Sequence, residues 1–177
     1  MDFPPKEIQL LVEEIADLLL MKNQTLSVSE GACGGLLSAY IISLPGASKF
    51  FDGGRLTYSL KSRLRLSGWD KDQIRDYIGP SESVVLKLAR NLRIEYGSNY
   101  VLSESGFAGP STNVGLDNES ITFSDDSKIG KVYLGISGPG GDRSCEVNTG
   151  TEDRSENMQL FAKAGLEFLL KVLREQK

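Results

Sequence analysis

The sequence contains no histidine among its 177 residues. This absence excludes nucleophilic sites that use imidazole as the base, and it excludes zinc sites built on histidine. The chain also has only two cysteines, Cys33 and Cys145, so we expect neither a disulfide scaffold nor a transition-metal site. We therefore expect no metal and no cofactor. Catalysis would have to use carboxylates, Lys, Tyr, Ser or Cys without imidazole.

Long apolar runs and clustered positive charge are missing as well. No apolar stretch approaches the length of about 18 residues that a membrane-spanning helix needs, and the N-terminus lacks the layout of a signal peptide. The formal net charge is −4, with Lys and Arg spread along the chain rather than gathered into a nucleic-acid footprint. We expect a cytoplasmic protein with neither a membrane nor a nucleic-acid partner.

What the sequence does contain is an alternation of helical and strand patterns. An apolar stripe from Ile8 to Leu19 has the spacing of an amphipathic helix, and Asp70 with Gln73 resembles a capping box. Further helices are expected over 36–43, 60–66, 70–78, from Ser81 through Leu92 and over 153–175, and strands over 25–29, 50–58, 100–105, 131–137 and 144–148. This alternation without a linker predicts one α/β layered domain over residues 1–177. The polar, acidic stretch 111–128 has no sustained periodicity and is interpreted as a loop insertion.

Four stretches carry a family resemblance. They are Ser29-Glu-Gly-Ala-Cys-Gly-Gly35, Tyr58-Ser-Leu-Lys-Ser-Arg63, Ser105-Gly-Phe-Ala-Gly-Pro110 and Ile129-Gly-Lys-Val-Tyr133. In this order and spacing they resemble the competence/damage-inducible CinA C-terminal domain family. The corresponding motifs of that family are AESCTGG, YSNEAK, TGIAGP or SGIAGP, and VGTVY. The resemblance runs from about Leu10 to Leu170.

The resemblance implies a three-layer α/β/α fold and a homo-oligomer. Active members of the family are nicotinamide mononucleotide amidases, which hydrolyse the carboxamide and release ammonia, and a Ser–Lys pair with a nearby Tyr is thought to carry the reaction. Such a pair needs no histidine, because a lysine desolvated in a pocket can serve as the base.

The match departs at the catalytic pair itself. The ungapped registers put the family serine at Gly31, which has no side chain, and the family lysine at Arg63. Arginine stays protonated in proteins and cannot act as a general base. The chain therefore resembles an amidase that has lost both members of its catalytic pair.

Two side chains are candidate substitutes. Cys33 could act as an alternative nucleophile with Lys61, although two helical positions turn Lys61 by about 200° from Arg63. The alternative interpretation is that Cys33 is a small apolar residue at the start of a helix. Tyr58 is retained from the family pattern, and it either lines the site or packs as an ordinary strand aromatic.

The candidate ligand-binding residues are Glu30, Gly34, Gly35, Ser105, Gly106, Gly109 and Arg154. Glycine turns at the ends of strands expose backbone N–H groups that favour anions, and Arg63 adds a permanent cation; the alternative is that the glycines only permit tight turns. Arg154 matches one arginine of the family pattern, and the second arginine of that pattern, four residues later, falls at Met158. Glu104, usually apolar or small in the family, is expected to face solvent.

Three hypotheses follow from these residues. The first is an inactive amidase homologue that retains a pocket for a ligand like nicotinamide mononucleotide. The second is an active hydrolase with rewired chemistry through Cys33 or Tyr58. The third is an oligomeric interaction protein without a ligand, in which the 111–128 insertion contacts a partner.

Overall fold

The computed structural model describes residues 3–112, 114–116, 119–121 and 125–176. Within these residues a mixed sheet of five strands forms the centre of the molecule, in the order β2-β1-β3-β6-β7. Its strands are β1 (Leu26–Glu30), β2 (Phe51–Leu56), β3 (Tyr100–Gly106), β6 (Lys131–Gly138) and β7 (Gly141–Asn148). β1 pairs in parallel with both β2 and β3, whereas β6 and β7 are antiparallel to their neighbours.

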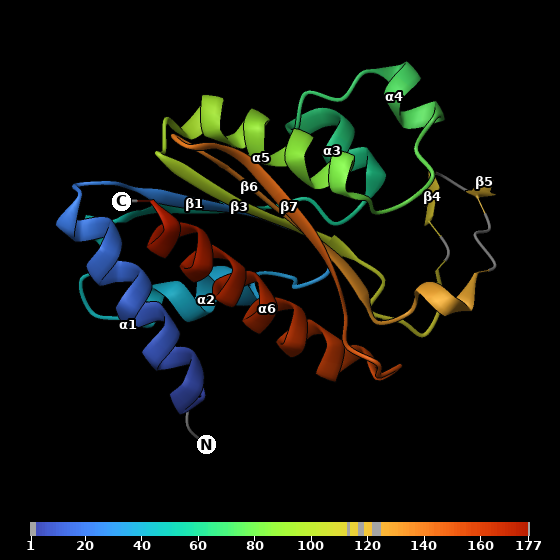
Figure 1. Cartoon of the computed structure of the whole chain (residues 1–177). Coiled ribbons are helices and arrows are strands. Elements are labelled where there is room, and N and C mark those ends of the chain that lie inside the picture. Colours follow the sequence, from blue (N-terminus) through green and yellow to red (C-terminus); the bar gives the residue numbers. More distant parts are fainter. Residues whose placement is uncertain (1–2, 113, 117–118, 122–124, 177) are drawn as a thin grey trace.

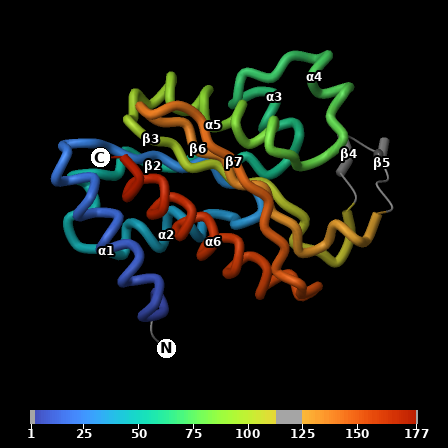
Figure 2. The backbone as a smooth tube through the Cα atoms, in the orientation of Figure 1, coloured from blue at the N-terminus to red at the C-terminus, as the bar shows by residue number. Residues whose placement is uncertain are grey.

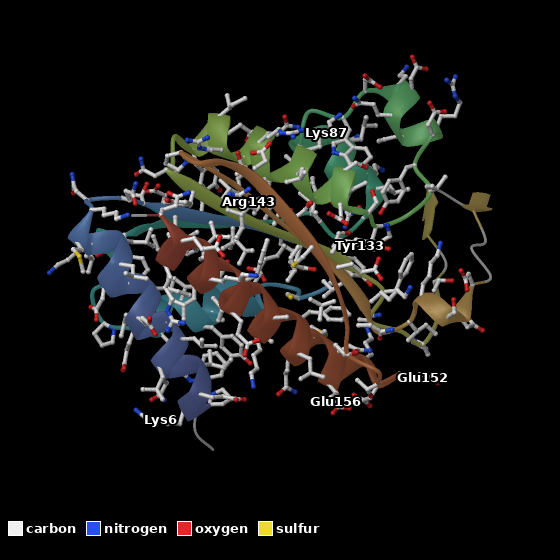
Figure 3. The ribbon with its side chains drawn as sticks, in the orientation of Figure 1. Lys6, Lys87, Tyr133, Arg143, Glu152 and Glu156 are labelled. Atoms are coloured by element: carbon white, nitrogen blue, oxygen red, sulfur yellow. The ribbon has the colours of Figure 1, made fainter. Side chains whose placement is uncertain are left out.

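Helices cover both faces of this sheet (Figure 1). One face carries α1 (Lys6–Met21), α2 (Leu36–Ile42) and α6 (Arg154–Glu175); the other carries α3 (Leu60–Leu66), α4 (Lys71–Arg75) and α5 (Glu82–Tyr96). The expected three-layer α/β/α arrangement is confirmed. The stick view shows side chains filling both spaces between the sheet and the helices (Figure 3).

The main apolar core lies between the sheet and the layer of α1, α2 and α6. The backbone tube shows α1 and α6 lying side by side (Figure 2), and two ion pairs of 2.6 Å, Glu7–Lys163 and Glu14–Arg174, join them at their outer surface. A second, smaller cluster joins the other layer, where Leu60 and Ile74 pack with Leu88 of α5. This cluster holds α3 and α4 beside the sheet edge at which β1 and β3 end.

Local signals explain most of the element boundaries. The Asp70 side chain accepts from the backbone N–H of Gln73, and the Gln73 side chain accepts from the backbone N–H of Asp70, so the capping box is confirmed. The helix predicted over 60–66 has those bounds, and the side chain of Ser81 caps α5. The predicted hairpin around residues 138–141 joins β6 to β7.

The 111–128 segment differs from the expected loop. Residues 113, 117–118 and 122–124 lie outside the described residues, but β4 (Val114–Leu116) and β5 (Glu119–Ile121) pair as a short antiparallel ribbon. Strands of three residues are too short to show an alternating pattern, so periodicity could not detect them. No helix in the described part of the chain is long and apolar enough to cross a membrane.

The topology places one sheet edge in a position suited to a site. β1 and β3 are parallel neighbours, so their carboxyl ends meet at the same edge. The chain leaves β1 through α2 on one face and reaches β3 through α5 on the other face. In open α/β sheets, ligands bind at such a change of direction, outside the carboxyl ends of the strands.

Candidate functional site

Glu104 occupies the backbone amides of the loop that follows β1. Its carboxylate accepts hydrogen bonds from the backbone N–H groups of Gly31 at 2.6 Å, Ala32 at 3.2 Å and Cys33 at 2.8 Å. The side chain is 0% exposed, so the expectation that Glu104 faces solvent is wrong. Both faces of β3 are buried, and strand alternation therefore says nothing about solvent there. Burial raises the pKa of Glu104, while the N–H groups of Cys33 and Gly31 oppose that rise.

Glu30 fills the next set of amides in the same way. Its carboxylate accepts from the backbone N–H groups of Gly35 at 3.0 Å, Leu37 at 3.0 Å and Ser38 at 2.9 Å, and also from Ser38 Oγ at 2.6 Å. A side chain of the protein thus satisfies the orphan N–H groups at the start of α2. The glycine turn is consequently closed to an external anion by Glu104 on one side and Glu30 on the other.

Arg63 approaches the same loop from the opposite face of the sheet. α3 begins at the cap residue Ser59 and carries Arg63 inward, where the side chain is 6% exposed. The guanidinium donates from Nε to the Thr57 carbonyl at 3.0 Å, from Nη1 to Tyr77 Oη at 2.9 Å and from Nη2 to Ser105 Oγ at 3.0 Å. All three acceptors are neutral groups.

Gly31 and Arg63 are in direct contact. A Cβ atom added at Gly31 would lie 2.7 Å from Arg63 Nη2, which is closer than real Cβ contacts allow. The guanidinium therefore occupies the space that a side chain at position 31 would need. The two positions that the resemblance places at the family's Ser–Lys pair therefore share one volume.

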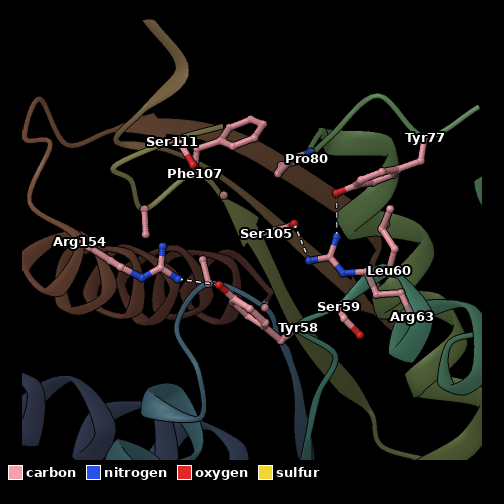
Figure 4. A pocket seen from close by; sticks show the side chains of 14 residues that line it. Tyr58, Ser59, Leu60, Arg63, Tyr77, Pro80, Ser105, Phe107, Ser111 and Arg154 are labelled. Atoms are coloured by element: carbon pink, nitrogen blue, oxygen red, sulfur yellow. Dashed lines mark hydrogen bonds between the residues drawn. The ribbon is translucent and has the colours of Figure 1, made fainter. Parts of the chain in front are cut away.

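Gly31 and Arg63 belong to one wall of a cavity of about 250 Å³ (Figure 4). This is slightly below the range of roughly 300–1,000 Å³ typical of ligand pockets. The cavity is lined by Gly31, Ala32, Tyr58, Ser59, Leu60, Arg63, Tyr77, Pro80, Ser105, Gly106, Phe107, Ala108, Ser111 and Arg154. No carboxylate, lysine or cysteine belongs to this lining, as far as the chain is described.

Tyr58 and Arg154 lie together on the side of the cavity away from Arg63 (Figure 4). Arg154 donates from Nη2 to Tyr58 Oη at 2.8 Å and from Nη1 to the Gly109 carbonyl at 2.5 Å. Tyr58 is 63% exposed and follows the end of β2, so it is not a packed strand aromatic. Met158, one helical turn after Arg154, packs against the core and lies 3.3 Å from where a Cβ of Gly34 would be.

The predicted site residues therefore divide into two sets. Gly31, Tyr58, Arg63, Ser105, Gly106 and Arg154 meet in the cavity lining, whereas Glu30, Cys33, Gly34, Gly35 and Gly109 lie outside it. The ligand contacts expected of Glu30, Gly34 and Gly35 stay predictions; in this structure the Glu30 carboxylate accepts from the backbone N–H groups of Gly35, Leu37 and Ser38. Gly109 contributes only the carbonyl that accepts from Arg154.

Cys33 is placed unfavourably for chemistry. Its side chain is 0% exposed within the main core. Burial, together with the nearby carboxylates of Glu104 and Glu30, raises the pKa of the Cys33 thiol well above its usual value. Reactive cysteines need electropositive, accessible surroundings. Lys61, its suggested partner, is an exposed residue outside the cavity lining.

Tyr77 and Phe107 line the cavity without being among the predicted site residues, and Glu104, predicted to face solvent, is buried. Tyr77 follows α4 and packs its ring edge-on against Trp69, with centroids 5.4 Å apart, which aims its hydroxyl at Arg63. Nothing in the local pattern around residue 77 indicates that position. Within the described residues, no group of three or more His, Cys, Asp or Glu side chains could hold a metal ion.

Comparisons with known proteins match the whole domain. A family model, the CinA C-terminal domain, matches residues 8–173. A CinA-like protein of Chlorobium limicola is 30% identical over 160 residues, which are 88% of this chain and 35% of that protein. A CinA-like protein of Desulforapulum autotrophicum is 29% identical over 159 residues, 90% of this chain and 35% of that protein. The chain thus spans about a third of the length of the curated relatives it matches.

Solved structures show the same fold. The competence/damage inducible protein CihA from Agrobacterium tumefaciens superposes with a TM-score of 0.83 at 22% identity, covering 99% of this chain and 100% of that chain. The competence damage-inducible protein A from Klebsiella pneumoniae gives a TM-score of 0.82 at 20% identity, covering 96% and 99%.

Proposed function

This chain belongs to the CinA C-terminal domain family, and we propose that within it the chain binds a small anionic, nucleotide-like molecule without hydrolysing an amide bond. The resemblance implies that active members hydrolyse nicotinamide mononucleotide with a Ser–Lys pair. The geometry at positions 31 and 63 favours binding without that reaction.

The observation that carries this proposal is the contact between Gly31 and Arg63. A permanent cation fills the volume where the family pattern has a nucleophile, and position 31 has no side chain to attack with. The remaining hydroxyl groups of the lining would need a base to become nucleophiles. Ser105 instead accepts a hydrogen bond from the protonated guanidinium of Arg63, which cannot take its proton.

A rewired hydrolase has less support. Cys33 is buried outside the cavity and its thiol is held protonated by its raised pKa. Tyr58 does line the cavity, but the group at hydrogen-bond distance from its hydroxyl is the guanidinium of Arg154, which is no base. Tyr58 is therefore assigned to ligand contact rather than to nucleophilic attack.

Calorimetric titration of the purified chain with nicotinamide mononucleotide, combined with an ammonia assay, tests the proposal. We expect saturable binding heats and no ammonia above the rate without protein. Arg154→Gln should weaken binding at least about fivefold, because a charge-assisted contact with the ligand is lost. Arg143 is exposed on β7 and lies outside the cavity, so Arg143→Gln is the control and should bind like the wild-type protein.

Two results would overturn the proposal. Ammonia release that scales with protein concentration would show that the amidase reaction survives. Titrations without heat beyond dilution at two different temperatures would show that the cavity does not take this class of ligand.

A further inference from the structure

We infer that the cavity selects a carboxylate at Arg63, so that its preferred ligand is a ring carboxylate with a second anionic group, and not the corresponding carboxamide. The inference deepens the proposed function and rests on it. It depends on which donors of the two cavity arginines remain for a ligand.

The backbone amides of the turn that follows β1 are not available to an anion. Glu104 takes the N–H groups of residues 31–33, and Glu30 takes those of residues 35, 37 and 38. An anionic ligand must therefore find its donors outside this turn, and its charge partners among the cavity side chains. Arg63 and Arg154 are the charged side chains among the residues that line the cavity.

Arg63 has donors left over. A guanidinium carries five N–H groups, and the protein uses one from each nitrogen, to Thr57, Tyr77 and Ser105. One N–H therefore remains on each of the two terminal nitrogens. Each is a charged donor that an acceptor on a ligand can use.

Arg63 also lacks a neutralising partner. It is 6% exposed, yet no ion pair joins it to a carboxylate in the part of the chain that the structure describes. Glu104 is close enough to feel its charge, but the Glu104 carboxylate is bound to the amides of residues 31–33. Because a buried unpaired charge is costly, an anion in the cavity would stabilise Arg63.

A carboxamide satisfies these donors poorly. Its oxygen can accept one or both N–H groups, but its NH₂ group is a donor that would face the cationic guanidinium. A carboxylate is acceptor-only and carries the missing charge. We expect the carboxylate form of a ligand to bind at least about tenfold more tightly than the amide form.

The other side of the cavity suits a second anion. Arg154 keeps unused N–H groups after binding Tyr58 and Gly109, and Figure 4 shows it across the cavity from Arg63. The side chains of Phe107 and Pro80 lie along the wall between the two arginines. A flat ring against this apolar wall, with a carboxylate toward Arg63 and a phosphate toward Arg154, fits these features.

The test compares two nucleotides that differ only at this group. Nicotinate mononucleotide and nicotinamide mononucleotide are titrated into the same protein preparation at the same ionic strength. We expect the nicotinate form to bind at least about tenfold more tightly. In Arg63→Gln this ratio should shrink, whereas Arg63→Lys, which keeps the charge, should retain more of it. Arg154→Gln should weaken both ligands by a similar factor and preserve the ratio.

The possible results distinguish the carboxylate preference from the proposed binding function. Equal affinity for the two nucleotides would overturn the carboxylate preference and leave the proposed binding function intact. An undiminished preference in a folded Arg63→Gln protein would overturn the assignment of that preference to Arg63. Failure of both nucleotides to bind, or release of ammonia from the amide, would overturn the proposed function itself.

Discussion

Arg63 sits with three hydrogen bonds in a space that it shares with position 31, so the two residues should be energetically coupled. Gly31→Ser forces the guanidinium away from Ser105 or Tyr77 and should lower the free energy of unfolding by about 1–3 kcal/mol. Adding Arg63→Lys relieves that clash. The double variant should therefore lose less stability than the sum of the two single variants.

Urea unfolding of the four proteins measures this coupling as a double-mutant cycle. Gly35→Ser is unsuitable as a control, because Gly35 has a φ of 99° and a serine there would be strained for a different reason. Strictly additive losses would contradict the shared volume.

The two thiols should differ in reactivity. Cys33 is enclosed in the core with a strongly raised pKa, whereas Cys145 on β7 is only partly buried. A thiol reagent at neutral pH should label one cysteine per native chain and two after denaturation. Cys145→Ser should leave no thiol that reacts in the folded state; rapid labelling of that variant would return Cys33 to the list of nucleophile candidates.

For some residues of the cavity, their place in the site could be predicted from the sequence, and for others it could not. Gly31, Arg63, Tyr58 and Ser105 sit inside contiguous motifs, so the register of those motifs found them. Glu104 lies on a strand buried on both faces, where alternation carries no information. Tyr77 reaches the cavity only because α3 and α4 fold back onto α5, which is a tertiary contact with no local signal.

At the scale of the secondary-structure elements, the cap of α4 supports the site from a distance. Asp70 starts this helix of five residues, and the turn after it presents Tyr77 to Arg63. Asp70→Ala should cost about 1 kcal/mol. Hydrogen exchange should show faster exchange over 71–77, with β1 and β3 unchanged. Lys61→Ala, an exposed position on α3, serves as a matched control; equal exchange in both variants would show that the cap does not hold this element.

Helices and long strands were predictable because each repeats its own signal over many residues. The apolar stripe of α1, the cap of α5 and the turn between β6 and β7 agree with the structure within a few residues. The ribbon of β4 and β5 gives no such repetition in three residues per strand. The placement of α3 and α4 over the sheet edge likewise depends on packing rather than on pattern.

At the scale of the whole molecule, Glu104 links the site to the pH dependence of folding. Burial raises its pKa above the ordinary 4.5, so the folded chain holds this proton more tightly than the unfolded chain does. The stability due to that proton is complete below pH 4.5 and is lost as the pH rises through the folded pKa. Glu104→Gln removes this titration.

The measurement is the free energy of unfolding of both proteins at several pH values. The stability of the unchanged protein relative to Glu104→Gln should fall as the pH rises above 4.5, by at most about 1.4 kcal/mol per pH unit. A relative stability that rises with pH would mean that the amides of residues 31–33 outweigh burial and lower the pKa instead.

The overlap of Gly31 with the Arg63 guanidinium also has an evolutionary consequence. A serine at position 31 would meet the far end of the Arg63 side chain, so the guanidinium must shift, or position 63 must shorten, when position 31 gains a side chain. Even then, Glu104 would still hold the adjoining amides. Substitutions at positions 31 and 63 are therefore expected to be epistatic, each changing the effect of the other.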